Sequence, residues 1–365
     1  MQTCLSRIIL AGTALICVGG STWAGTIYTV TDLGTLGGTS SSSAGISSNG
    51  TYVTGQSNNG STTHAFSTTG GAMKDLGTLG GSSTGYAINN SGEVAGYSNG
   101  NAFLYNGTTI QDLGTLSGTT SLAYGINDSG NVVGYSNFAG GDSHSYHAFL
   151  YSGGVMTDLG ALGGTSSYAS AINDSGQIAG YITPNSSSTA AFLYSGGTET
   201  LLGTLGGSIS SAAAISSNGY VAGSSTLSNG NTHAFLYAGG SLIDLGTLGG
   251  TTSRASGVND TGQVVGESLF SGSGFDGFFY SGGVLADLNT LIDPSLGIRI
   301  NNATGITDGG VIAATGIVGG QTHALLLTPE AASATPEPTT FALAGVGALL
   351  FGLVIRHLPR CHIPG

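Results

Sequence analysis

The sequence predicts an all-β protein, a seven-bladed β-propeller of four-stranded repeats that is closed by its own N-terminal strand. Three observations lead to this prediction. A unit of typically 43 residues recurs along the chain with its sequence boxes in a constant order. Each unit holds four short apolar or alternating runs, which is the content of one propeller blade. The two ends of the repeated region also complement each other.

Three boxes define the unit. The first reads DLGTLGG in its fullest form, and its aspartate position is occupied by Asp32, Asp75, Asp112, Asp158, Leu201, Asp244 and Asp287. The second is a turn such as NDSG, which begins at Ser47, Asn89, Asn127, Asn173, Ser216, Asn259 and Thr307. The third is a strand such as HAFLY, which begins at His64, Asn101, His147, Ala190, His233, Asp276 and His323. Each box therefore occurs seven times.

The runs between the boxes predict strands. In one unit they are Tyr168–Asn173, Gln177–Tyr181, Ala190–Tyr194 and Glu199–Leu205, each bounded by Gly, Asn, Asp or Ser. Runs of four to eight residues with such boundaries are typical of β-strands, and the 3.6-residue period of an amphipathic helix is missing. The turn box predicts a tight hairpin whose final glycine has positive φ.

The ends of the repeated region predict ring closure. The first fragment, Thr26–Leu36, holds only the DLGTL strand, and the last unit lacks that strand after its HALLL segment. If the first strand completes the last blade, the sheet edge at the junction is paired. The propeller then occupies residues 25–329. A β-solenoid is the rival architecture, but it requires capping segments, and none is visible.

The amino-acid composition argues against some classes of binding partner. Only 7% of the residues are charged, and the formal net charge is −12, with Lys74, Arg254 and Arg299 as the basic residues of the propeller. This balance argues against a nucleic-acid partner, which requires a basic surface. The cysteines, Cys4, Cys17 and Cys361, lie outside the propeller, so blade packing rather than disulfides must stabilise it.

Both termini carry predicted targeting segments. Residues 1–24 have the pattern of a secretory signal peptide, with Arg7, the apolar run Ile8–Gly20 and a cleavage site after Ala24. After the propeller come a linker with a Pro-Glu-Pro motif at 330–338, an uncharged run at 339–355 and a basic tail at 356–365. The uncharged run is long enough for a short transmembrane helix with a cytoplasmic basic end.

The C-terminal segment resembles the PEP-CTERM sorting signal of Gram-negative bacteria that produce exopolysaccharide. The residues that match are Pro336, Glu337 and Pro338, followed by the apolar run and then by Arg356 and Arg360. The resemblance implies processing by an exosortase, and hence a protein that is held transiently in the inner membrane before it reaches the cell surface or medium. The chain continues to Gly365, slightly beyond the basic residues of the signal. A plain single-span anchor is the alternative.

The propeller resembles the HAF family of extracellular repeats, named for the His-Ala-Phe found here at His64, His147 and His233. Other units depart from that pattern, with Asn101, Ala190 or Asp276 in place of the histidine. The resemblance covers nearly the whole mature chain, but it does not supply a ligand.

Candidate site residues are weighed against the periodicity of the chain. Histidines in equivalent positions of different blades are spread around a ring, whereas metal ligands must converge on one ion. We therefore expect a structural hydrogen bond or a strand-edge role from His64, His147, His233 and His323, no metal at the neighbouring His144 and His147, and simple turn chemistry from Asp128, Asp174 and Asp260. No catalytic, cofactor or metal site is predicted.

The segments that break the repeat are the places where a propeller enzyme would carry its chemistry. They are the insertion Asn137–Tyr146, the loop Ser268–Phe275 and the connection Ile292–Asn302 with Arg299, and they offer few acid–base groups. The expected function is therefore non-enzymatic: a matrix or biofilm protein that is adhesive or contacts carbohydrate, with exopolysaccharide as a partner. The alternative is a hydrolase or lyase that acts on extracellular polysaccharide.

Overall fold

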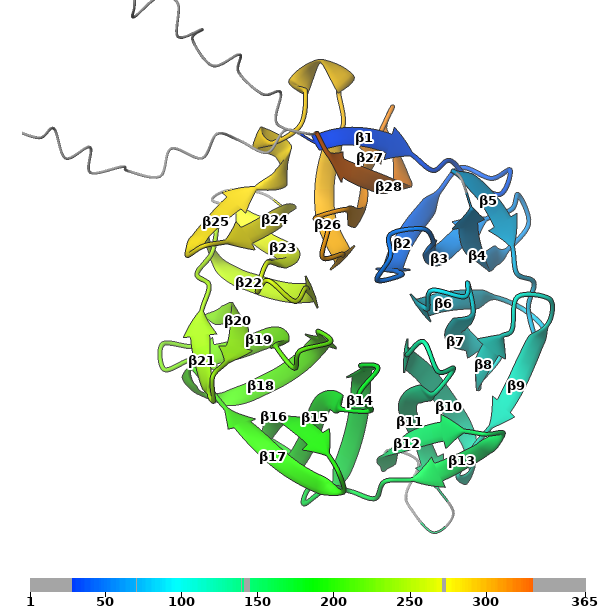
Figure 1. Cartoon of the computed structure of the whole chain (residues 1–365), viewed down its shortest axis with the longest axis vertical. Coiled ribbons are helices and arrows are strands. Elements are labelled where there is room, and N and C mark those ends of the chain that lie inside the picture. The colour runs from blue at the N-terminus through cyan, green and yellow to red at the C-terminus, as the bar shows by residue number, and fades with distance from the viewer. Residues whose placement is uncertain (1–27, 70, 139, 141–144, 271–273, 331–365) are drawn as a thin grey trace, which may run out of the picture. The chain divides into compact units, whose positions relative to one another are not determined.

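The computed structural model describes residues 28–330, except residues 70, 139, 141–144 and 271–273. In this part of the chain the regular structure is β-strand apart from two short 3-10 helices, so the prediction of an all-β fold is confirmed. The strands form seven four-stranded antiparallel units, arranged in a ring (Figure 1). A cavity at the centre of the ring is lined by residues of all seven units, and we call it the central channel. We call these units blades 1 to 7 in chain order.

The strands follow the same order in each blade, from the channel outward. The innermost strands are β2 (Ser41–Ile46), β6 (Ser83–Ile88), β10 (Ser117–Ile126), β14 (Ser166–Ile172), β18 (Gly206–Ile215), β22 (Gly249–Val258) and β26 (Arg299–Ile306). The second strands are β3 (Val53–Asn58), β7 (Val94–Ser98), β11 (Val132–Phe138), β15 (Ile178–Asn185), β19 (Val221–Leu227), β23 (Val264–Phe270) and β27 (Ile312–Val318). The third strands are β4 (Thr63–Thr69), β8 (Asn101–Tyr105), β12 (Tyr146–Ser152), β16 (Ser188–Ser195), β20 (Thr232–Ala238), β24 (Phe275–Ser281) and β28 (Gln321–Pro329). The outermost strands are β5 (Ala72–Asp75), β9 (Ile110–Gly114), β13 (Val155–Asp158), β17 (Thr198–Gly203), β21 (Ser241–Asp244), β25 (Val284–Asp287) and β1 (Tyr28–Asp32).

The outermost strand of blade 7 comes from the N-terminal end of the described chain. Strand β1 pairs antiparallel with β28, in a register that places Tyr28 opposite Pro329 and Asp32 opposite Leu325. The innermost strand of blade 7, β26, in turn contacts β2 of blade 1. The pairing expected from the complementary chain ends is therefore present, and the strand edge at the junction is satisfied by backbone hydrogen bonds.

A buried phenylalanine sits at the centre of nearly every blade. It is the third residue of the HAF box, and it has no exposed surface in any of six blades: Phe66, Phe103, Phe149, Phe192, Phe235 and Phe278. Leu325 takes this position in blade 7. The apolar clusters span neighbouring blades, as where Ala65 of blade 1 packs with Phe103 of blade 2. Burial of these rings at the blade interfaces is the main stabilising contribution.

A buried serine joins each of the first six blades to the blade before it. In blade 3, the Ser121 hydroxyl accepts a hydrogen bond of 2.8 Å from the backbone N–H of Ala102 in blade 2 and donates one of 2.5 Å to the carbonyl of Gly114. The same contact to the preceding HAF strand is made by Ser41, Ser83, Ser167, Ser210 and Ser253. These serines satisfy backbone N–H groups that the curvature of the ring would otherwise leave unpaired.

The turn residues behave as the sequence predicts. The last glycines of the NDSG turns, Gly130 and Gly176, have φ of 74° and 76°, and the Gly130 N–H donates to the carbonyl of Asn127. The outer hairpins with Ser-Gly-Gly place two consecutive glycines at positive φ, as at Gly153 and Gly154. Left-handed backbone at these points is accessible to glycine without a steric cost.

The expected targeting segments lie outside the described residues. These are the signal peptide with Ala24, the run 339–355, and the sorting residues Pro336, Glu337, Pro338, Arg356 and Arg360. Across the described ranges, no helix is both long enough and apolar enough to cross a membrane.

Candidate functional site

The central channel contains a cavity with a volume of about 540 Å³. The innermost strand of each blade contributes one side chain to its wall at the same position, three residues before the turn box. In blades 1 to 7 these residues are Ala44, Tyr86, Tyr124, Ser170, Ala213, Ser256 and Thr304. At this position the side chain is small in five blades and a large aromatic ring in two neighbouring ones, whereas an isoleucine or valine two residues further on lines the channel in every blade.

The two aromatic rings belong to a larger cluster, which we call the tyrosine cluster: Tyr86, Tyr124, Tyr135, Tyr146, Tyr168 and Tyr181. Tyr86 and Tyr124 are stacked, with ring centroids 4.6 Å apart and an interplanar angle of 22°. Tyr168 and Tyr181 are stacked across β14 and β15 at 4.7 Å and 14°. Tyr135 joins the two pairs, at 5.6 Å from Tyr124 and 4.9 Å from Tyr168. The cluster spans blades 2 to 4, and rings that pack on one another hold their orientation.

Burial keeps the hydroxyls of this cluster protonated. It raises the pKa of Tyr181 to about 12 and raises the pKa of Tyr124 further. Burial also raises the pKa of Tyr86, with a hydrogen bond to Tyr124 acting in the opposite direction. The tyrosines that reach the channel therefore present neutral O–H groups at physiological pH, which can both donate and accept hydrogen bonds. The hydroxyls of Ser170 and Ser256 on the same wall have no hydrogen-bond partner within the described residues.

One mouth of the channel is formed by the turn boxes, and here the structure corrects the sequence-based interpretation. Asp128 and Asp174 were expected to serve their own turns, but each carboxylate bonds to the turn of the preceding blade. The Asp174 Oδ1 accepts a 2.8 Å bond from the Asp128 N–H, and Asp128 Oδ1 accepts one from the Asn90 N–H. Asp260 does the same for Asn218. The turn itself is held by the first residue of the box, as where Asn127 Oδ1 accepts from the Asn131 N–H.

The aspartate carboxylates that accept these cross-blade bonds give the mouth a negative charge. Asp128, Asp174, Asp260 and Asp308 all line the channel, and no Lys, Arg or His does so within the described part of the chain. An anionic ligand would be repelled at this mouth, whereas a neutral one would not be.

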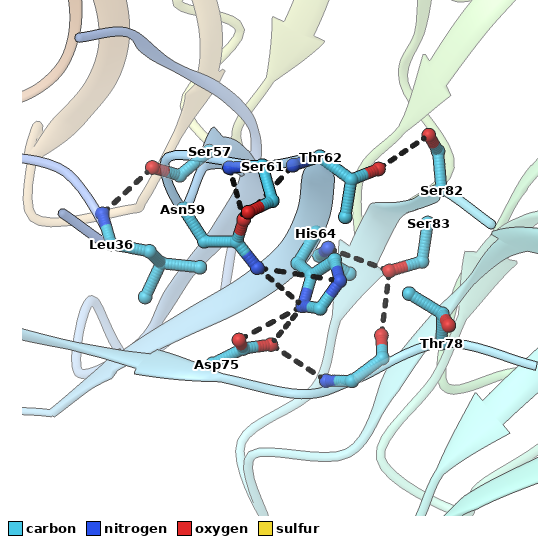
Figure 2. Close-up of polar contacts among 12 residues, drawn as sticks. Leu36, Ser57, Asn59, Ser61, Thr62, His64, Asp75, Thr78, Ser82 and Ser83 are labelled. Atoms are coloured by element: carbon cyan, nitrogen blue, oxygen red, sulfur yellow. Dashed lines mark hydrogen bonds and ion pairs between the residues drawn. The ribbon is translucent and has the colours of Figure 1, made fainter. Parts of the chain in front are cut away.

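The HAF histidines lie away from the channel and pair with the boxed aspartates. Figure 2 shows His64 beside Asp75, with the His64 Nδ1 2.8 Å from the Asp75 Oδ1. The same carboxylate accepts a 2.8 Å bond from the N–H of Gly77, which orders the turn into the next blade. Equivalent pairs join His147 to Asp158, His233 to Asp244 and His323 to Asp32. The last of these pairs bridges the junction between the chain ends.

Units that lack the histidine compensate in the same place. In blade 2, Asn101 donates a 2.7 Å bond to Asp112. In blade 4, Ala190 and Leu201 replace both partners at once, so no polar group is left alone. In blade 6 the histidine position holds the buried Asp276, and the Arg299 Nε lies 2.8 Å from its Oδ1. The expectation that the histidines make repeated structural hydrogen bonds is therefore confirmed.

No metal site emerges from these groups. Across the described ranges, no three His, Cys, Asp or Glu side chains gather closely enough to hold an ion. His144 lies outside the described residues.

The tyrosine cluster is the feature that sequence reasoning missed. Its members are spread over three repeats, and each lies in a run that reads as an ordinary strand. An alignment of the repeats contains part of the pattern. In blades 2 to 4 the Ala-Gly or Val-Gly pair of the second strand is followed by a tyrosine, and two of these three tyrosines belong to the cluster: Tyr97, Tyr135 and Tyr181, the last two being cluster members.

Comparison with known proteins gives only distant likenesses. No protein-family model matches the chain, and no curated protein matches it. Among solved structures, TolB from Acinetobacter baumannii has a TM-score of 0.40 at 13% identity, over 63% of this chain and 59% of its own. An AofleA mutant from Arthrobotrys oligospora has a TM-score of 0.40 at 13% identity, over 71% and 88%. Trypanosoma rangeli sialidase has a TM-score of 0.35 at 10% identity, over 90% and 60%. The chain thus spans less than two thirds of the length of that TolB.

Proposed function

We propose that this protein is a non-enzymatic, exported propeller of the extracellular matrix, and that its central channel binds neutral carbohydrate. The observation that carries the proposal is the asymmetry of the channel wall. Tyr86, Tyr124 and Tyr181 add aromatic rings to one side of it, whereas the other five blades have small residues, among them Ser170 and Ser256, at the position that Tyr86 and Tyr124 occupy. A repeat protein has no need of that asymmetry for folding, because alanine or serine occupies the same position in four other blades.

The chemistry of the wall matches a sugar. The C–H face of a pyranose packs on an aromatic ring, and its hydroxyls exchange hydrogen bonds with neutral O–H groups. Ligand sites in proteins generally combine an apolar, aromatic surface with a few polar groups that orient the ligand. The acidic mouth formed by Asp128, Asp174, Asp260 and Asp308 disfavours uronic acids and other anionic sugars. A neutral polysaccharide therefore suits this channel best.

Replacement of a channel tyrosine by serine tests this proposal. We expect Tyr124→Ser to weaken binding of a neutral hexasaccharide of glucose, galactose or mannose by about tenfold or more, since the loss of an aromatic contact costs about 1.5 kcal/mol or more. The variant should fold, because serine occupies this position in blades 4 and 6. Calorimetric titration of the purified propeller measures the affinity.

Ala213→Ser is the matched control, since it places serine at the same position of blade 5 without removing an aromatic ring. Equal affinity of Tyr124→Ser and the parent for every hexasaccharide that binds would overturn the assignment of the channel. Release of new reducing ends by the parent protein would instead indicate the alternative, a hydrolase or lyase.

We also propose that residues 336–360 act as an exosortase sorting signal, on the strength of the sequence resemblance. Glu337 is the one charged residue between Ala331 and Ile355, so it is the natural determinant of specificity. We expect Glu337→Ala to leave the propeller folded but to hold the uncut protein in the inner membrane. The measurement is mass spectrometry of the C-terminal peptide together with cell fractionation.

The control for the sorting signal is Glu330→Ala, which removes a carboxylate seven residues before Glu337 and should be processed normally. Detection of Arg360 on wild-type protein at the cell surface would contradict processing and leave a plain membrane anchor.

A further inference from the structure

The face of blade 4 carries a second depression, separate from the channel mouth formed by the turn boxes. It has a volume of about 520 Å³, and we call it the blade-4 groove. Its walls come from the start of β14, the hairpin between β15 and β16, and the beginning of β18. The residues that matter here are Tyr168, Thr183, Asn185, Ser188, Thr189 and Ile209. Volumes of roughly 300–1,000 Å³ are usual for small-molecule sites.

Blade 4 is where the repeat departs most from its own pattern. Both partners of the His–Asp pair are replaced there, by Ala190 and Leu201, and Leu201 is 53% exposed. The hairpin strands β15 and β16 are eight residues long, and their pairing becomes irregular between Ile182 and Asn185. These changes replace the polar His–Asp pair by apolar side chains, and Ile209, which lines the groove, is 42% exposed.

The groove offers hydrogen-bonding groups that the fold does not use. The Asn185 Oδ1 holds its own turn, through a 3.0 Å bond from the Ser187 N–H, but its side-chain nitrogen has no partner in the described part of the chain. The Ser188 hydroxyl is likewise without a partner there. Among the described residues that line the groove, none carries a charge. Unpaired neutral donors beside an aromatic ring suit a polyol rather than an ion.

The aromatic ring of the groove belongs to the tyrosine cluster. Tyr168 lines the groove, Tyr181 lines the channel, and the two rings are stacked with centroids 4.7 Å apart. Their Cα atoms are direct cross-strand partners in β14 and β15. The same pair of side chains therefore forms part of the wall of two separate cavities, and packing fixes the orientation of both rings.

We propose that the blade-4 groove is a second site for neutral oligosaccharide, so that one propeller holds two carbohydrate chains at once. The proposal rests on the proposed function, since it adds a second contact of the same chemistry. Two sites on one rigid body allow a matrix protein to cross-link polysaccharide chains, and several propellers bound along the same two chains would gain avidity.

The test is a groove-filling substitution, Ser188→Trp, compared with Asn231→Trp. Asn231 occupies the position of Ser188 in the equivalent hairpin of blade 5, and both residues are half-buried, so the two variants carry the same steric load. Each protein is titrated calorimetrically with the neutral hexasaccharide that binds the parent most tightly. We expect two molecules bound per parent propeller and per Asn231→Trp variant, and one per Ser188→Trp variant.

The channel variant Tyr124→Ser separates this inference from the proposed function. It should retain the groove site, and its combination with Ser188→Trp should leave only channel binding, weakened by about tenfold or more. A stoichiometry of two that Ser188→Trp does not change would overturn the groove while leaving the channel assignment intact. If the parent binds one molecule and Tyr124→Ser weakens that binding, the single site is the channel, and the groove assignment is overturned. Absence of binding by the parent would overturn both.

Discussion

Deletion of residues 26–36 is expected to lower the Tm of the propeller by roughly 10 °C or more, because each kcal/mol lost shifts Tm by about 2–4 °C in a protein of this size. The deletion removes β1, which supplies the outermost strand of blade 7. It also removes two buried side chains, Tyr28 at 2% exposure and Leu33 at 5%. Each such side chain contributes about 1.5–3 kcal/mol by burial, and the backbone pairing with β28 adds to this.

The effect should extend beyond blade 7, since Tyr28 also packs against Phe279 of blade 6, with ring centroids 6.3 Å apart. His323 would lose its partner Asp32. Thermal melts followed by circular dichroism measure the change. Removal of residues 331–365, which follow the last strand, is the control and should leave Tm unchanged. An added peptide of residues 26–36 should restore part of the lost stability, and a scrambled peptide should not.

An unchanged Tm after the N-terminal deletion would contradict closure of the ring by β1. Rescue by the scrambled peptide would show that the gain is not due to strand pairing.

Substitution of Gly134 by alanine is the second change from which we expect a large loss, about 3 kcal/mol or more, since overpacking against rigid backbone exceeds the usual 1–3 kcal/mol. A Cβ atom at Gly134 would collide with the carbonyl oxygen of Leu122 and lie 2.9 Å from the Cα of Ala123. The cause is a bulge in β10, where the register with β11 shifts between Ala123 and Gly125. The partner strand must therefore present glycine at the closest approach.

The same collision recurs at the equivalent glycines of five other blades: Gly55, Gly96, Gly180, Gly223 and Gly266. Blade 7 has Ala314 at this position, and the second register shift of its inner strand pair lies directly beside the bulge, between Ile300 and Asn302, whereas in blade 3 it lies between Ser117 and Ser121. Gly309→Ala is the control, because the nearest atom to its Cβ would be 3.7 Å away and its φ is not left-handed. Guanidinium titration compares the variants. A Gly134→Ala protein within about 0.5 kcal/mol of the parent, the range of ordinary surface changes, would mean that the bulge relaxes freely.

The outcome for the His-Ala-Phe box shows how far periodicity alone can lead. The repetition of the histidine indicated a structural role, and the structure gives that role its partner, the aspartate of the following box. The pair is close in space because the third and outermost strands of a blade are antiparallel neighbours, as in the register that places Phe66 opposite Asp75. In blade 4 both members of the His–Asp pair are replaced together, by Ala190 and Leu201. The same geometry explains this, since a histidine or an aspartate alone would lack its partner.

The turn boxes illustrate the opposite case. From sequence, Asp128 and Asp174 looked like residues of isolated hairpins, because each unit contains only one of them. Their contacts are made between units, from the carboxylate of one blade to the backbone of the blade before it, 46 positions away in the chain. Local sequence reports on local turns, but it does not show which turns the ring brings together.

By itself, the sequence determined the class of the fold, the number of repeats, the four strands of each repeat, the glycine turns and the origin of the closing strand. These features depend on patterns with a short period and on the conformational freedom of glycine, and both are properties of neighbouring residues. Tertiary structure alone decided which side chains share the channel wall. Tyr86 and Tyr124 come from the same position of two repeats, and Tyr181 comes from the second strand of a third. Only the curvature of the ring and the bulges of the inner strands bring the three rings to one side of the channel.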